Sequence, residues 1–182
     1  MNKSNSQCYE MIFNEDWITK LPEFDLIQKN REKLFNSENL FKCLRGYAES
    51  EKRQIFGIDT GKLGEKRKKA IETYGYSYRN ASHAIRLLRC GIIFFRDNYY
   101  PVNIFQKDKD YGPLCKDIKV NPQNYNPKEI EKLINELDKQ LEIQFEKREI
   151  NYNFDSKFAN ELCFDLYFPI LSRHYIDKII KP

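Results

Sequence analysis

Residues that favour turns are scarce in this chain. Only 7 Gly and 7 Pro stand among 182 residues, too few for a fold built from many hairpins. The longest apolar run, residues 91–95, is far too short to cross a bilayer. The first seven residues lack the apolar core of a signal peptide. These absences argue against a β-sandwich, a membrane-spanning helix and a secretory leader.

Cysteine and histidine are also too sparse for a structural metal or disulfide framework. The five cysteines are dozens of residues apart and never form Cys-x-x-Cys, and the chain has only two histidines that could join them as metal ligands. We therefore expect a reduced cytoplasmic protein in which the cysteines act as small buried apolar residues. The cysteines are Cys8, Cys43, Cys90, Cys115 and Cys163, and the two histidines are His83 and His174. We expect His174 to be a surface or partly buried helix residue.

Recognisable catalytic motifs are missing as well. There is no Gly-rich phosphate loop, no Ser/His/Asp order and no metal-ligand His pair. The single Asp-x-Asp spacing, Asp108-Lys109-Asp110, lies in a Gly- and Pro-containing stretch, residues 108–124, that predicts a long irregular connection. We interpret it as a hydrophilic loop, and we predict no catalytic and no metal-binding residue in this chain.

The residues that are present favour helices. Hydrophobic residues make up 41% of the chain and charged residues 32%, which is typical of a folded domain with a charged surface. Apolar residues recur at helical spacing in several segments. These predict helices over residues 37–56, 62–74 and 78–97, one from 127, one after 156, and two or three short helices in the first forty residues. Residues 98–105 are the only segment expected to be extended.

We therefore predict an all-α fold, a compact multi-helix domain with at most a small β element. Residues 126–182 are expected to form a helical hairpin packed on residues 1–125, so that both parts belong to one domain. Asn126 followed by Pro127 is a strong signal for the start of a helix. Asn36 and Ser37 supply a similar signal for the helix that follows them.

Positive charge is concentrated in the middle of the chain. Residues 41–100 hold 13 Lys and Arg against 6 Asp and Glu, whereas the whole chain has a net charge of only +4. Within the helix expected over residues 78–97, the core stripe is Ala81, Ile85, Leu88, Ile92 and Phe95. A helical turn of 100° per residue places Arg79, His83 and Arg86 on the opposite face.

Arg79, His83 and Arg86 are side chains suited to binding phosphate. Lys66 and Arg67, on the preceding basic helix, extend the same candidate surface. A solvated helix face is the alternative interpretation of these charges. However, Cys90 and Ile93 continue the face that carries Arg79, and a face that turns apolar predicts a helix covered on both sides.

The segment around this helix resembles predicted nucleotidyltransferases of the DNA polymerase β superfamily, a group linked to RNA repair. The resemblance is carried by Gly64-Glu-Lys-Arg-Lys68 and by the stretch from Tyr74 to Gly91, which contains His83-Ala-Ile-Arg-Leu-Leu. The segment Phe41-Lys-Cys-Leu-Arg-Gly-Tyr-Ala48 is similar to a further helix of that family, and residues 5–13 to the segment after its catalytic core. Together the matches cover about residues 5–120.

The sequence departs from that family in three ways. Ser77 stands where the family usually has Asp, and Arg79 where it usually has Lys. The Gly-Ser turn and the carboxylates that hold two magnesium ions are absent. The resemblance therefore implies the C-terminal helical part of such an enzyme without its catalytic domain.

These observations support two hypotheses. In the first, the chain is a catalytically incomplete module that binds nucleotide or nucleic-acid phosphates through Arg79, His83, Arg86, Lys66 and Arg67. It would need no cofactor itself, and Mg²⁺ would enter only with a separate catalytic chain. In the second, it is a protein interaction or oligomerisation domain that binds no nucleotide. An enzyme with an unrecognised site is a third possibility, and we expect the chain alone to transfer no nucleotide.

Overall fold

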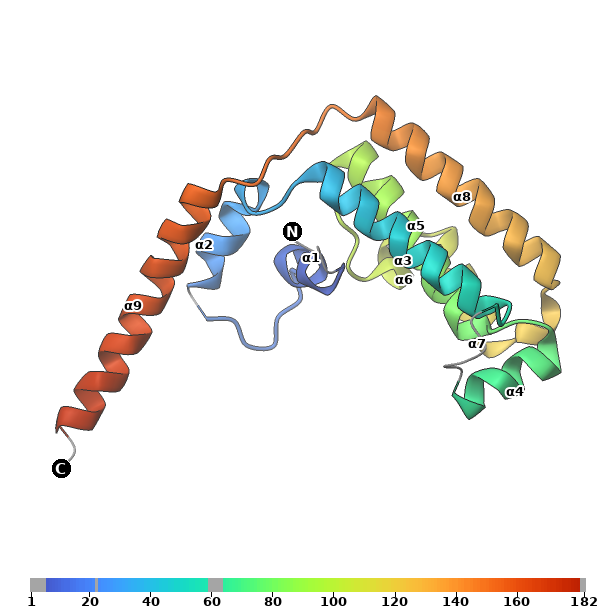
Figure 1. Ribbon diagram of the computed structural model, residues 1–182, viewed down its shortest axis with the longest axis horizontal. Helices are drawn as coiled ribbons and strands as arrows, with labels where there is room; N and C mark the ends of the chain where they lie inside the picture. Colours follow the sequence, from blue (N-terminus) through green and yellow to red (C-terminus); the bar gives the residue numbers. More distant parts are fainter. Residues whose placement is uncertain (1–5, 22, 59–63, 181–182) are drawn as a thin grey trace. The chain divides into compact units, whose positions relative to one another are not determined.

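The computed structural model describes residues 6–21, 23–58 and 64–180, and within these ranges every regular element is a helix (Figure 1). The predicted all-α class is confirmed. The longer helices are α3 (Ser37–Ile55), α4 (Glu65–Tyr74), α5 (Tyr78–Asp97), α7 (Tyr111–Val120), α8 (Pro127–Lys147) and α9 (Ser156–Ile180). The short ones are α1 (Ser6–Phe13), α2 (Phe24–Lys29), η1 (Arg31–Lys33), α6 (Ile104–Lys107) and η3 (Pro122–Asn124).

The chain divides into two compact units. The first consists of Met1–Phe13 with Glu38–Ile150, and the second of Asn14–Ser37 with Asn151–Pro182. The boundary expected between residues 125 and 126 therefore falls inside the first unit. Helix α8 belongs to the first unit and α9 to the second, so the predicted hairpin of these two helices stays a prediction.

Helix α5 is the central helix of the first unit. Thirteen of its residues are buried, and it packs mainly against α8 and α7 (Figure 1). Cys90 and Ile93 are among the buried residues, which confirms that α5 is covered on more than its core stripe. Gly91 lies where α5 is in close contact with α3 and α8. A Cβ there would stand 2.7 Å from Leu44 Cδ1 of α3 and 2.8 Å from Leu141 Cδ1 of α8.

Local sequence explains where several helices begin and end. Gly75 follows the last residue of α4, and its φ of 77° is a left-handed conformation that glycine adopts without strain. Asn98 follows the last residue of α5 and has a φ of 53°. The side chain of Asn126 accepts a hydrogen bond from the backbone nitrogen of Lys128, and Pro127 is the first residue of α8. These boundaries follow the sequence-based expectations.

Two expectations for residues 98–124 were wrong. Residues 98–105 form no strand, and residues 108–124 contain α7 and η3 instead of an irregular connection. Gly112 and Pro113 are the second and third residues of α7. Proline is tolerated there because the backbone nitrogens of a first helical turn have no partner within the helix.

The second unit is assembled from two distant segments of the chain. The backbone nitrogen of Ser37 donates to the carbonyl of Tyr152 over 3.0 Å, and the nitrogen of Tyr152 donates to Ser37 Oγ over 2.9 Å. Phe35 packs edge-on against Tyr152. Asp155 caps the start of α9, because its carboxylate accepts a hydrogen bond from the backbone nitrogen of Phe158.

The described cysteines only partly match the expectation of small buried residues. Cys90 and Cys115 are buried, Cys43 is half-buried and Cys163 is exposed, and all four are free thiols. Burial raises the pKa of the Cys90 thiol to about 12 and that of Cys115 to about 11. The side chains of Cys8 and His174 lie outside those the structure describes. Among the helices described, none combines the length and apolarity that crossing a membrane would require.

Candidate functional site

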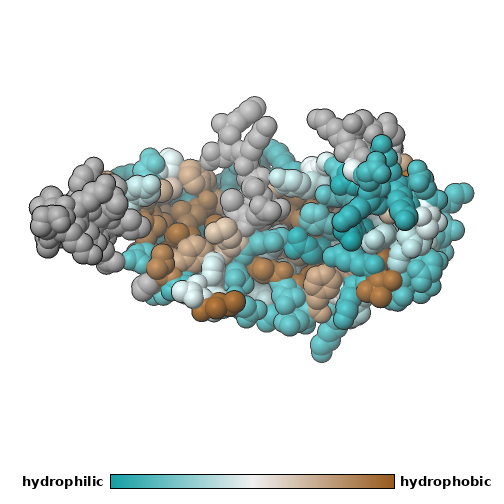
Figure 2. All heavy atoms as spheres, turned by 90° about the horizontal axis from the view of Figure 1, so that it is seen from below, coloured by the Kyte–Doolittle hydropathy of each residue, from teal (hydrophilic) through white to brown (hydrophobic). Residues whose placement is uncertain are grey.

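A pocket of about 850 Å³ opens between α3, α4 and the first turns of α5. Figure 2 shows that hydrophilic residues cover most of the end of the first unit at which α4 lies. Its described lining includes Glu51, Lys66, Arg67, Tyr74, Arg79 and His83. Four of the five residues predicted to bind phosphate thus line one pocket, although they come from two helices.

One face of α4 forms a wall of this pocket. Lys66, Ala70 and Tyr74 all line it and stand four residues apart, so they project from the same side of the helix. Ala70 is buried, whereas Lys66 is exposed. The left-handed turn at Gly75 then brings the start of α5 alongside, and Arg79 and His83 supply the facing wall.

The described lining residues carry an excess of positive charge. Among them, Lys66, Arg67, Lys69 and Arg79 are cations, and Glu51 and Glu65 are carboxylates. Lys66, Lys69 and Arg79 are exposed and Arg67 is half-buried. An exposed group of cations in a concave surface attracts anions and leaves its donors accessible to them.

Glu51 joins α3 to the α5 wall of the pocket. Its Oε1 lies 3.3 Å from His83 Nδ1, and its Oε2 accepts a hydrogen bond from Asn80 Nδ2. Asn80 Oδ1 in turn accepts a hydrogen bond of 2.6 Å from Ser77 Oγ. Burial by itself would raise the pKa of the Glu51 carboxyl, but the bonds from His83 and Asn80 and the charges of His83 and Arg67 lower it. Glu51 is therefore an ionised residue that orients His83.

Arg86 does not join the other predicted residues. It lies outside the described lining of the pocket, and its Nη2 pairs with Glu10 Oε1 of α1 over 2.9 Å. Only 19% of the Arg86 side chain and 25% of the Glu10 side chain are exposed. The pair holds α1 against α5, so Arg86 is committed to an internal contact.

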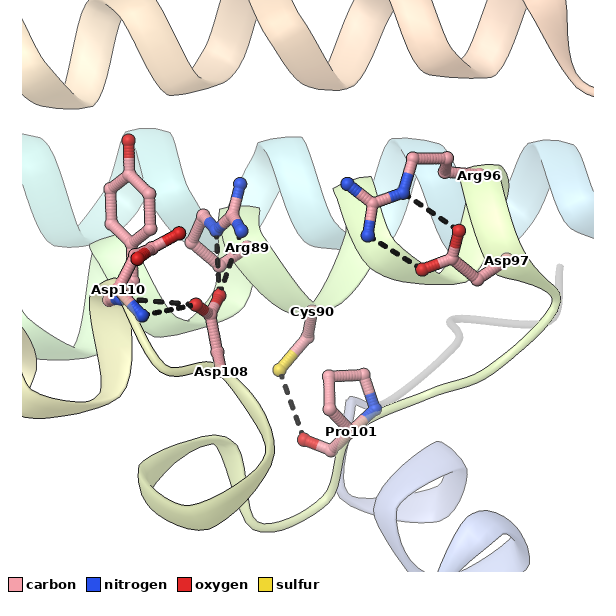
Figure 3. Close-up of polar contacts among 8 residues, drawn as sticks. Arg89, Cys90, Arg96, Asp97, Pro101, Asp108 and Asp110 are labelled. Carbon is pink, nitrogen blue, oxygen red and sulfur yellow. Dashed lines mark hydrogen bonds and ion pairs between the residues drawn. The ribbon is translucent and has the colours of Figure 1, made fainter.

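The Asp108-Lys109-Asp110 segment has a structural role that its sequence did not reveal (Figure 3). Asp108 is 6% exposed, and its Oδ2 is 2.9 Å from both Nε and Nη2 of Arg89. Its Oδ1 accepts hydrogen bonds from the backbone nitrogens of Asp110 and Tyr111 at the start of α7. The interpretation as a hydrophilic loop was wrong for Asp108, which is buried and joins α5 to α7.

These contacts do not fit a two-magnesium centre. A metal ligand needs a carboxylate oxygen free to coordinate, and both oxygens of Asp108 are engaged by protein donors. Asp97 is held by Arg96 through two hydrogen bonds of 2.6 and 2.7 Å (Figure 3). Across the described parts of the chain, His, Cys, Asp and Glu side chains form no group that could hold a metal ion.

The pocket contains residues that sequence reasoning missed. Glu51 lies 32 positions before His83, and no periodicity connects α3 with α5, so only the packing of the helices could bring them together. Tyr74 and Tyr78 left a weak signal, because aromatic residues flank the glycine turn between the two basic helices. Both tyrosines belong to the stretch that resembles nucleotidyltransferases, and nothing in that stretch predicts the contact between them.

Comparisons of the chain with protein-family models, with curated proteins and with solved structures found no match. The resemblance to nucleotidyltransferases therefore stays an expectation from the sequence.

Proposed function

We propose that this chain binds the phosphates of a nucleotide or nucleic acid in the pocket between α3, α4 and α5. The observation that carries the proposal is the convergence of Lys66, Arg67, Arg79 and His83 on one concave surface. Arginine presents a planar fork of donors that suits phosphate oxygens, and lysine adds a mobile cation. Arg86 is left out of the site because it pairs with Glu10.

We propose that this module binds phosphate but does not itself catalyse nucleotidyl transfer. Nucleotidyl transfer needs carboxylates that hold divalent ions beside the triphosphate. The described lining of this pocket offers the carboxylates of Glu51 and Glu65, and Glu51 is engaged by His83 and Asn80. A separate chain that carries a Gly-Ser turn and an Asp-x-Asp motif would supply the catalytic centre and its Mg²⁺.

The test is a binding titration at several salt concentrations. Fluorescently labelled single-stranded RNA and ATP are titrated with the wild-type protein and with the double variant Arg67→Ala/Arg79→Ala. Each lost charge-assisted contact should cost about 1.5 to 3 kcal/mol, so loss of both should lower the affinity by more than about 100-fold. The slope of log K against log salt for RNA should become shallower by about one for each lost phosphate contact.

A matched control removes the same charge elsewhere in the first unit. Lys139 and Lys147 are exposed on α8 and lie outside the described lining of the pocket, so Lys139→Ala/Lys147→Ala should bind almost as the wild type does. Equal weakening by both double variants would indicate only diffuse attraction to net charge and would contradict the site. A stable oligomer that binds neither ligand at any salt concentration would favour the interaction-domain hypothesis.

A further inference from the structure

The pocket has an aromatic end as well as a basic one. Tyr74 is the last residue of α4 and Tyr78 the first of α5, and both line the pocket. Their ring centroids are 5.9 Å apart in an edge-to-face arrangement, and both side chains are half-buried. The guanidinium of Arg79 lies 5.9 Å from the Tyr78 ring centroid.

The two ends are separated along α4. Lys66 and Tyr74 project from the same side of the helix and are eight residues apart, which is about 12 Å along its axis. The amino end of α4 and the cations of its first turn thus lie at one end of the wall, and the tyrosine rings lie at the other. A bare polyphosphate has no group that the aromatic end would recognise.

We propose that Tyr74 and Tyr78 make the pocket selective for a nucleotide over inorganic polyphosphate, by stacking the base while the cations hold the phosphates. This inference rests on the proposed function. A nucleobase has a flat π-face that stacks on a tyrosine ring, and stacking of this kind tolerates any base. The guanidinium of Arg79 lies over the Tyr78 ring, so one cation of the pocket stands at its aromatic end.

The test compares two ligands that carry the same triphosphate. Binding of ATP and of inorganic tripolyphosphate is measured by calorimetry for the wild type, for Tyr74→Leu/Tyr78→Leu and for Tyr74→Phe/Tyr78→Phe. ATP should bind the wild type about 5- to 100-fold more tightly than tripolyphosphate, the range expected from stacking on aromatic side chains. The leucine variant should lose this preference and still bind tripolyphosphate, and the phenylalanine variant should keep it.

Tyr167→Leu is the control for a general effect of removing a tyrosine. Tyr167 is 65% exposed on α9, in the other unit, and its replacement should leave the preference for ATP unchanged. The wild-type comparison needs no variant, so a folding defect in the leucine variant would not obscure it.

The outcomes separate this inference from the proposed function. If ATP and tripolyphosphate bind the wild type equally, the role of the tyrosines is overturned while phosphate binding stands. Binding of labelled single-stranded RNA without binding of ATP would likewise overturn the role of the tyrosines and leave phosphate binding in place. If RNA, ATP and tripolyphosphate all fail to bind, both proposals fall.

Discussion

Arg79 and Arg86 lie two helical turns apart on α5, and the structure gives them different surroundings. Arg79 is exposed at the pocket, whereas Arg86 is mostly buried and pairs with Glu10. Helical periodicity cannot distinguish the surroundings of these two arginines. It shows which residues share one side of a helix, but not which neighbouring element covers that side. Here α1 covers the part of the face that carries Arg86.

This difference predicts that the same substitution has effects of different size on stability at the two positions. Arg86→Ala should lower the free energy of unfolding by about 1 to 3 kcal/mol, because it leaves the half-buried carboxylate of Glu10 without its partner. Arg79→Ala, on the same helix, should change it by less than about 0.5 kcal/mol. Urea denaturation followed by circular dichroism measures both. An Arg86→Ala variant as stable as Arg79→Ala would show that the ion pair with Glu10 adds nothing to folding.

At the scale of the elements, the fold depends on how closely α3 and α8 approach α5. The helices are close at Gly91, since a Cβ there would meet Leu44 and Leu141 at less than 3 Å. Gly46, in the interior of α3, has no such neighbour within 4 Å and is exposed. Close packing therefore requires a glycine at position 91, whereas it does not require one at position 46.

Alanine substitutions should distinguish these two glycines. Gly91→Ala should destabilise the protein by about 1 to 3 kcal/mol, because the leucine side chains must move out of well-packed positions. Gly46→Ala should stabilise it by about 0.5 to 1 kcal/mol, because alanine is the better helix former and meets open space. Thermal and urea unfolding of both variants provide the measurement. Equal and small effects would contradict the close packing of α3, α5 and α8.

At the scale of the whole molecule, we predict that the chain alone transfers no nucleotide. The displacement of pyrophosphate builds negative charge that divalent ions normally neutralise, and both oxygens of Asp108 are already engaged by protein donors. The protein is incubated with labelled nucleoside triphosphates, Mg²⁺ or Mn²⁺, and RNA or protein acceptors, and no labelled product should form. Metal-dependent labelling by the chain alone would contradict the prediction. Labelling only after addition of an Asp-x-Asp-bearing chain would support a divided enzyme.

The sequence by itself determined the helical class, the bounds of α3 and α5, the end of α4 and the starts of α8 and α9. Apolar spacing and residues such as Gly75 and Asn126 act within a few positions of where they stand, so they can be interpreted without the fold. The sequence also identified Lys66, Arg67, Arg79 and His83 as side chains suited to phosphate.

Only the tertiary structure decided which of the charged residues share a site. Glu51 joins His83 from another helix, Arg86 turns to Glu10, and Asp108 is buried against Arg89. The division into two units, each built from separate segments of the chain, was also invisible in the sequence. The physical reason is that such contacts join residues on different elements, 19 positions apart or more. The packing of whole helices, which no local pattern specifies, sets their distances.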